Sequence, residues 1–338
     1  MRPFRRWGRA LAGAGVAALF IALLARRMDW MEVRQVLAGA RWAPLALGLF
    51  ALAGDMGARA ARWCWMLRAA QPDLPLASCL RPFLGSLALN NTMPLRAGDV
   101  VRVFGFRRTL RAPAARVVGT LMLERVLDLL VLLAILFVGM LGAPPGTFPR
   151  PFRVLAGLAG LLGLTGLLAI TLLPGRITSL LQRLVARAVG SRSWAPQAFQ
   201  GVAQMTSALA LLRSPGRAAR LLGLSLLAWL LEGALFASVA WSLHIQVSWP
   251  APWLSLGAAT LATLLPSSPG YVGTFDYFAM LGLTAYGTGR NAAAAFALLA
   301  HLMLWLPVTL AGLVALLLGR PAGVPATLRP DPLRADPA

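Results

Sequence analysis

The stretch Asn90–Phe104, NNTMPLRAGDVVRVF, places polar and helix-breaking residues inside an otherwise apolar chain. Pro94 removes a backbone donor and breaks a helix, and Gly98 permits a tight turn. Asp99 follows at the start of the next predicted helix, where the positive end of the helix dipole favours its charge. Non-helical backbone at membrane depth is tolerated only where protein or a water-filled cavity satisfies its polar groups. This turn is therefore typical of a hairpin tip that lines a cavity. The candidate binding residues here are Asn90, Pro94, Arg96, Gly98, Asp99 and Arg102.

Arg102 differs from the other arginines of this segment in its helical position. At 100° per residue, Asp99 and Arg102 lie on one side of the helix, and Arg107, Arg108 and Arg111 lie on the other. We therefore expect Arg102 to face inward with Asp99. The alternative is that all of them lie at the cytoplasmic rim and that Asp99 only caps a helix.

A second broken stretch, LLPSSPGYVGTFDYF, parallels the first. Prolines and glycines interrupt an apolar run, and an acidic residue follows at the start of the next helical piece. Paired broken helices in two halves of a chain indicate a transporter's binding site, and half-helix N-termini suit an anion such as phosphate. The alternative is a pair of ordinary short loops. The candidates are Pro269, Gly270, Gly273 and Asp276.

Three charges lie within one apolar run, in LMLERVLDLL. Glu124 and Asp128 are four residues apart and share a helical face, and Arg125 can pair with Asp128 at a spacing of three. Each charge inside a membrane span costs about 2.5–3.5 kcal/mol, so the three should be paired and face the protein interior. They would either bind the substrate or lock this helix to the charged residues at 96–102.

Glu232 lies near the middle of another apolar run, with no charged partner in that run. Intramembrane acids are candidates for function, so Glu232 is a candidate for proton coupling. His301 would be either its partner or a buried, hydrogen-bonded residue. We expect Asp55, with Arg59 and Arg62 nearby, to form an ion pair at the membrane interface. No metal-ligand spacing, nucleotide-binding loop or nucleophile motif occurs, so we expect no catalytic residue, metal or cofactor.

The composition explains how such charges come to be buried. The chain has 338 residues, of which 58% are hydrophobic and 13% are charged, and its mean hydropathy is +0.71. These values predict an all-α polytopic membrane protein. The formal net charge of +21 comes entirely from arginine. Cytoplasmic loops of membrane proteins collect such residues, which accounts for the charge without nucleic acid as a partner.

The apolar runs divide the chain into one membrane domain, 1–320, and a disordered tail, 321–338. Segment 175–212 is predicted to form amphipathic helix on the cytoplasmic surface. The predicted full spans are 10–25, 42–58, 114–141, 153–173, 218–243 and 291–318, and the broken stretches are 76–95 and 252–288.

The distribution of arginine sets the expected orientation. The Arg-rich segments 96–116 and 174–220 should be cytoplasmic, as should 59–81 and both termini. The loop 244–253 should lie outside. Each broken stretch then enters and leaves on one side, which predicts two re-entrant hairpins that open to opposite faces. The Arg-rich loop 26–41 disagrees with this scheme, which places it outside.

The ordered motifs resemble one known family. The pattern N..MP.R.GD..R of Asn90–Arg102, ER..D of Glu124–Asp128 and P..PG..G..D of Pro266–Asp276 together resemble the lysylphosphatidylglycerol synthase transmembrane-region family. Glu is commoner in that family at the positions of Asp99 and Asp276. The resemblance covers about 40–320 and implies a bacterial inner-membrane protein that moves or presents a lipid between leaflets. The family's aminoacyltransferases carry a large soluble catalytic domain that the resemblance does not include.

These observations combine into one expected function and two alternatives. We expect a non-enzymatic, flippase-like transporter of an anionic phospholipid, isoprenoid lipid or glycolipid, with Arg96, Arg102 and Arg125 facing the anion of the headgroup. The first alternative is a membrane transferase that acts on lipid-linked substrates, with Glu124 and Asp128 as its only acid–base pair. The second is a scaffold for enzymes of a lipid or hopanoid pathway.

Overall fold

The computed structural model of the protein describes residues 15–26, 28–93, 96–189, 195–265 and 268–318. These residues form helices and no strands, which confirms the all-α prediction. Pro94 and Pro266, the first fourteen residues and the predicted tail lie outside the described residues. After a short apolar helix at Gly15–Ala25, the α-helices are α2 (Trp30–Ala38), α3 (Trp42–Arg68), α4 (Leu76–Thr92), α5 (Ala97–Phe104), α6 (Arg107–Leu110), α7 (Ala114–Gly142), α8 (Arg150–Leu172), α9 (Pro174–Val189), α10 (Ala195–Thr206), α11 (Pro215–Ser242), α12 (Ala251–Ala262), α13 (Thr274–Thr284) and α14 (Arg290–Leu318), with 3₁₀ turns η2 (Leu209–Arg213) and η3 (Pro269–Tyr271).

Four predicted spans coincide with long helices, namely α7, α8, α11 and α14. Among the described residues, α11 and α14 are long and apolar enough to cross a membrane, and α2 with α3 makes a third candidate that bends by 84°. The count of six full spans therefore stays a prediction. The predicted span 42–58 is only the first part of α3, which has 27 residues and ends at Arg68. The side chains of Arg59 and Arg62 are turned into the protein from this helix, and the cytoplasmic location of the segment stays a prediction.

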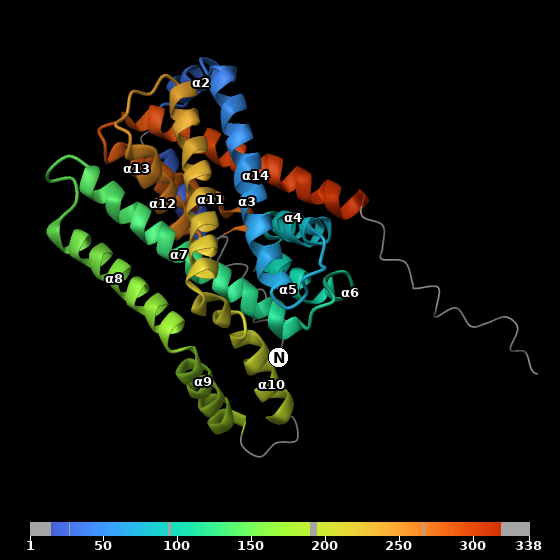
Figure 1. The fold of residues 1–338 in the computed structure, drawn as a ribbon. Coiled ribbons are helices and arrows are strands. Elements are labelled where there is room, and N and C mark those ends of the chain that lie inside the picture. The colour runs from blue at the N-terminus through green and yellow to red at the C-terminus, as the bar shows by residue number, and fades with distance from the viewer. Residues whose placement is uncertain (1–14, 27, 94–95, 190–194, 266–267, 319–338) are drawn as a thin grey trace, which may run out of the picture.

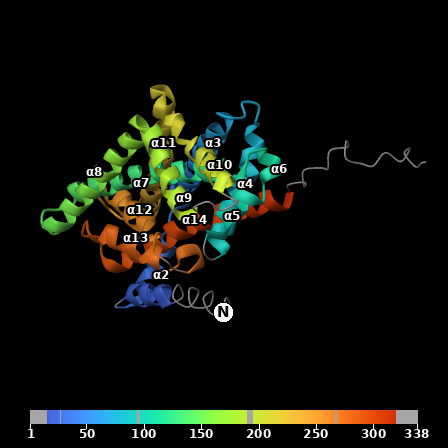
Figure 2. The same ribbon diagram turned by 90° about the horizontal axis from the view of Figure 1, so that it is seen from below.

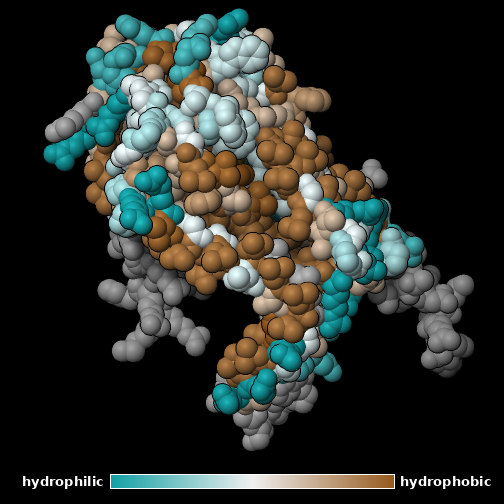
Figure 3. Space-filling view, turned by 60° about the vertical axis from the view of Figure 1, so that its left-hand side comes forward, coloured by the Kyte–Doolittle hydropathy of each residue, from teal (hydrophilic) through white to brown (hydrophobic). Residues whose placement is uncertain are grey.

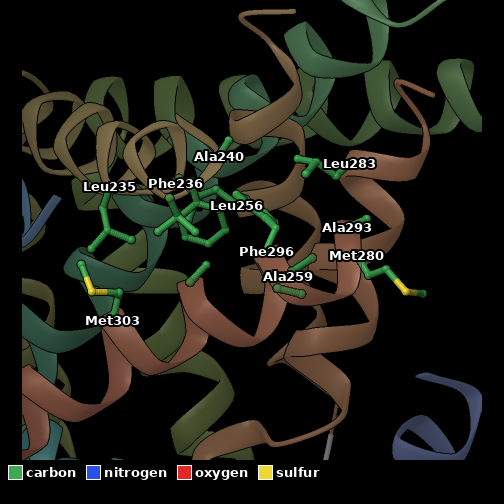
Figure 4. Close-up of a cluster of buried hydrophobic side chains, with 14 of the residues drawn as sticks. Leu235, Phe236, Ala240, Leu256, Ala259, Met280, Leu283, Ala293, Phe296 and Met303 are labelled. Carbon is green, nitrogen blue, oxygen red and sulfur yellow. The ribbon is translucent and has the colours of Figure 1, made fainter. Parts of the chain in front are cut away.

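The core forms where α11, α12, α13 and α14 meet beside α3. In Figure 1, α3 and α11 run side by side, and α14 crosses behind them. Phe236 of α11 and Phe296 of α14 are fully buried, with their ring centroids 5.8 Å apart in an edge-to-face contact that aromatic pairs prefer. Figure 4 shows these rings among Leu256 and Ala259 of α12 and Met280 of α13. This packing fixes α11 and α14, which carry Glu232 and His301.

Both broken stretches form helical hairpins, in which α4 packs against α5 and α12 packs against α13. The breaks themselves meet. The Arg96 Nε donates a hydrogen bond to the Tyr271 hydroxyl at 3.0 Å, and the Trp305 Nε1 donates to the Asn91 carbonyl at 3.3 Å. Arg96 and Tyr271 both have left-handed backbones, with φ of 53° and 59°. The parallel seen in the sequence thus corresponds to contact in space, although membrane re-entry itself stays a prediction.

The segment predicted as one amphipathic helix, 175–212, is divided among α9, α10 and η2. Figure 1 shows α8 and α9 leading away from the helices around α3, with α10 returning, and in the view from below in Figure 2 α9 and α10 lie over the middle of the molecule. On α9 the side chains of Leu180 and Leu184 are about half exposed and share the helix with exposed Arg183 and Arg187. This pattern agrees with an interfacial helix.

The outer surface carries much apolar area. Figure 3 shows apolar side chains gathered across the middle of one face, with hydrophilic patches toward its edges. Exposed large side chains include Phe50 at 78%, Leu162 at 71% and Leu317 at 83%. A soluble monomer rarely exposes so much contiguous apolar surface, so this face suits contact with lipid.

Candidate functional site

A cavity of about 240 Å³ lies where the two breaks meet the long helices. Its walls come from both hairpins and from α3, α7, α11 and α14. The charged or titratable residues that line it are Arg59, Glu124, Arg125, Asp128, Glu232 and His301, and its aromatic residues are Phe83, Trp229, Tyr271, Phe275 and Trp305. We call this space the central cavity.

Arg59 of α3 gathers three carboxylates from three helices. Its Nε lies 2.6 Å from Asp55 Oδ1, its Nη2 lies 2.6 Å from Glu232 Oε2, and its Nη1 lies 3.6 Å from Asp128 Oδ2. Its guanidinium also stacks over Trp229, 4.2 Å from the ring centroid. Asp55 is fully buried and forms the predicted ion pair, while its position relative to the membrane interface stays a prediction.

Arg62, one turn further along α3, holds Asp128 in a bidentate pair. Its Nη1 and Nη2 lie 2.6 and 3.2 Å from the two carboxylate oxygens. The same Nη1 donates to Ser225 Oγ at 2.6 Å, and the Trp229 Nε1 donates to Asp128 Oδ1 at 3.2 Å. The prediction that Arg125 pairs with Asp128 is wrong, because α3 lies close enough to supply two arginines with better geometry.

The network around α3 carries one more acid than base. Two guanidinium groups face three carboxylates, so its formal charge is −1 when every group is ionised. One proton would make the network neutral. Of its carboxylates, Glu232 is the one that both lines the cavity and, among the described charges, contacts only Arg59. The members are Asp55, Arg59, Arg62, Asp128 and Glu232.

Arg102 is buried, as predicted, with 1% of its surface exposed. Its guanidinium stacks on Trp63 at 3.7 Å from the ring centroid, and its Nη2 lies 3.3 Å from Glu124 Oε2. Glu124 lines the central cavity, but Arg102 is not among the lining residues. The position of Arg102 therefore suits it to hold Glu124 in place.

Arg125 and Asp99 form the most accessible ion pair of the site. Their closest atoms are 3.4 Å apart, and the two side chains are 40% and 25% exposed. Asp99 is held by Asn90, whose Nδ2 donates to Asp99 Oδ1 at 2.9 Å and whose Oδ1 accepts from the Asp99 backbone N–H at 3.2 Å. The acid is therefore fixed in the first turn of α5, while the arginine keeps exposed donors at the cavity.

Asp276 is the buried counterpart of Asp99 in the second hairpin. Its Oδ2 accepts from the Gly273 N–H at 2.8 Å, which caps α13. Its Oδ1 lies 2.8 Å from His301 Nδ1, and His301 Nε2 lies 2.9 Å from the Gly270 carbonyl. Of the two alternatives for His301, the hydrogen-bonded one is correct, and its carboxylate partner is Asp276.

Both ring nitrogens of His301 are engaged. A carbonyl oxygen only accepts, so Nε2 donates to Gly270, while Nδ1 faces the Asp276 carboxylate. These two contacts fix the orientation of the ring at the cavity.

The cavity brings together five of the predicted residues, Glu124, Arg125, Asp128, Glu232 and Gly270. Others support it from the hairpins: Asn90, Arg96, Gly98, Asp99, Arg102, Pro269, Gly273 and Asp276. Sequence analysis missed the central role of Arg59 and Arg62. The signal was present in Asp55, Arg59 and Arg62, whose spacings of three and four place them on one face of a helix that runs beyond residue 58.

Comparison with known proteins identifies one family. The sequence model of the family described as "Lysylphosphatidylglycerol synthase TM region" matches residues 10–312. A search of curated proteins found no significant match.

Proposed function

The chain belongs to the lysylphosphatidylglycerol synthase TM region family, and we propose that it moves or presents a lipid between the leaflets of the bacterial inner membrane. In this proposal the polar headgroup enters the central cavity and the hydrocarbon tails stay in the bilayer. Both hairpins are re-entrant, and both termini are cytoplasmic.

The observation that carries the proposal is a small charged cavity among helices whose outer surfaces are apolar. Charged groups are expensive inside a membrane and are kept there for function. Its volume of about 240 Å³ is below the ~300–1,000 Å³ of pockets for drug-sized ligands. It therefore suits a headgroup better than a whole lipid.

Arg125 is the proposed contact for the headgroup phosphate. Arg59, Arg62 and Arg102 are paired with carboxylates, and the last two have almost no exposed surface. Arg125 is the most exposed of these arginines, and its contact with Asp99 is 3.4 Å long. Among the described arginine–carboxylate contacts, only the secondary one between Arg59 and Asp128, at 3.6 Å, is longer. A planar guanidinium binds phosphate oxygens in a fork, so a phosphate could replace Asp99.

Glu232 is the proposed site of proton exchange. A proton on this carboxyl group would weaken its pair with Arg59 and cancel the excess charge of the network around α3. Arg59 would then be free to turn toward a bound phosphate. Headgroup entry and proton binding would be coupled through Arg59.

The test is leaflet exchange in sealed liposomes that contain the purified protein. We would measure the loss of fluorescence of nitrobenzoxadiazole-labelled phosphatidylglycerol on addition of dithionite, which reaches only the outer leaflet. We expect exchange by the wild type and at least tenfold slower exchange by Arg125→Gln. The control Arg153→Gln removes an exposed arginine from α8 and should behave as the wild type.

Two results would overturn the proposal. If Arg125→Gln exchanged lipid at the wild-type rate, Arg125 would not be the contact for the headgroup phosphate. Absence of exchange by a folded wild type, together with lipid product formed in detergent and lost in Asp128→Asn, would favour the transferase alternative. A scaffold would instead tolerate both substitutions and fail when 175–212 is deleted.

A further inference from the structure

A second, larger hollow lies away from the central cavity, at the corner formed by α4, α5, α6 and the turn before α7. Its volume is about 870 Å³. Four arginines line it, together with Phe104, Phe106 and the turn residues between them. These arginines are Arg81, Arg107, Arg108 and Arg111. We call this hollow the rim pocket.

None of the described residues that line the rim pocket carries a carboxylate. The sequence from Val100 to Leu123 contains five arginines and no Asp or Glu. Among the described residues, Arg107, Arg108 and Arg111 form no ion pair with a carboxylate, and all three are exposed. The arginines of the central cavity, in contrast, are each paired. The rim pocket is therefore a concentrated positive potential at a concave surface.

The pocket is anchored to the fold on one side and meets apolar surface on the other. The Arg81 guanidinium lies 5.7 Å from the ring centroid of buried Phe106, and its Nη2 donates to the Leu316 carbonyl of α14 at 3.4 Å. Phe104, on the pocket wall, is 60% exposed. A charged hollow thus adjoins an exposed aromatic ring, an arrangement that matches a phosphate group joined to hydrocarbon.

We propose that the rim pocket binds the phosphate of an anionic phospholipid, with Arg107, Arg108 and Arg111 on the phosphate and Phe104 against the acyl chains. The site is separate from the central cavity, since the two share no lining residue. It would hold a lipid at the cytoplasmic edge of the hairpin formed by α4 and α5. This inference concerns binding alone and does not depend on whether the protein moves lipid.

The test is native mass spectrometry of the full chain in detergent, titrated with phosphatidylglycerol and, separately, with phosphatidylcholine. We expect the wild type to retain phosphatidylglycerol at least tenfold more tightly than phosphatidylcholine. The triple variant Arg107→Gln/Arg108→Gln/Arg111→Gln should lose this preference. Phe104→Ser should weaken phosphatidylglycerol severalfold, because it removes only the contact with the chains.

The matched control removes the same charge elsewhere. Arg34, Arg150 and Arg153 are exposed and line neither cavity, so Arg34→Gln/Arg150→Gln/Arg153→Gln should keep the preference. Equal losses in both triple variants would overturn the proposal, because general surface charge would then explain the binding. Melting curves by circular dichroism confirm that each variant is folded.

A parallel arm distinguishes a lipid from a free phosphate ion. Equilibrium dialysis with radioactive inorganic phosphate should give binding at least tenfold weaker than phosphatidylglycerol. If inorganic phosphate binds as tightly and is lost in the first triple variant, the site takes a soluble anion and the lipid assignment is wrong. Loss of the site would leave leaflet exchange through Arg125 measurable, so failures of the two proposals can be told apart.

Discussion

The two helical hairpins share one design but use it differently. In each, a break is followed by an acid in the first turn of the next helix, Asp99 in α5 and Asp276 in α13. Asp276 is buried, caps its helix and contacts His301 at 2.8 Å. Asp99 is 25% exposed and lies 3.4 Å from Arg125, whose side chain is 40% exposed.

This difference separates a structural acid from an exchangeable one. Every oxygen of Asp276 has a partner inside the protein, so replacing any of these partners with a ligand would leave buried groups unpaired. The long, accessible contact of Asp99 can be given up at little cost. The acid of the second hairpin therefore holds its own hairpin tip in place. The acid of the first hairpin pairs with Arg125, a cation that can exchange Asp99 for a ligand.

The largest difference should appear when each acid is truncated. Asp276→Ala removes a helix cap and leaves the Nδ1 of His301 without its partner, which should cost about 3 kcal/mol of stability. Asp99→Ala should cost about 1 kcal/mol, because its ion pair and dipole interaction are partly solvated. Thermal melting in detergent measures both. Equal losses of melting temperature would contradict the distinction between the two acids.

A smaller effect should follow from adding one methyl group where α5 crosses α4. A Cβ at Gly98 would overlap the backbone carbonyl of Ser86. Because backbone cannot move aside as a side chain can, Gly98→Ala should cost about 2 kcal/mol. Gly223→Ala is the control, since a Cβ there meets open space. Unchanged melting of Gly98→Ala would show that the first hairpin is not packed in this way.

The hydrogen bond between the two hairpins should contribute less to stability than the packing at Gly98. Tyr271→Phe removes the hydroxyl that accepts from Arg96 and should cost about 1 kcal/mol. Tyr277→Phe is a suitable comparison, because Tyr277 contributes aromatic ring contacts to Phe20 and Phe278. A larger loss in Tyr277→Phe than in Tyr271→Phe would indicate that the tips are not joined through this bond.

The smallest expected effect is a gain in lipid affinity rather than a loss of stability. Asp99→Asn keeps the shape of the side chain but removes the charge that competes for Arg125. Because an accessible ion pair contributes about 0.2–1 kcal/mol, phosphatidylglycerol in the central cavity should bind up to about fivefold more tightly. Native mass spectrometry in the background of the rim-pocket triple variant measures this. Weaker binding by Asp99→Asn would mean that Asp99 assists the ligand.

Much of the helical framework follows from apolar runs in the sequence. The bounds of α7, α11 and α14 were predicted within a few residues, because Pro113 and Pro215 mark helix starts and long apolar runs follow. The length of α3 was missed because Arg59 and Arg62 lower the local hydropathy. A helix can carry such residues when other helices supply their partners, and those partners lie far away in sequence.

The ion-pair partners were harder to predict than the charged positions. Spacing within α7 favoured a pair between Arg125 and Asp128, but spacing cannot reveal that Arg62 of α3 reaches Asp128 with two donors. Contact between Arg96 and Tyr271 was equally hidden, because 175 positions separate them. Sequence patterns located the charges, and only the packing of helices assigns their partners.

The most direct measurement is photo-crosslinking with a phosphatidylglycerol analogue that carries a diazirine on its headgroup, followed by peptide mapping. We expect adducts on cavity residues such as Trp229, Tyr271 and Trp305, and their loss in Arg125→Gln. Adducts at the rim pocket should remain in that variant. Labelling confined to the outer surface, with none in the central cavity, would contradict the claim that the headgroup enters the space where the two breaks meet.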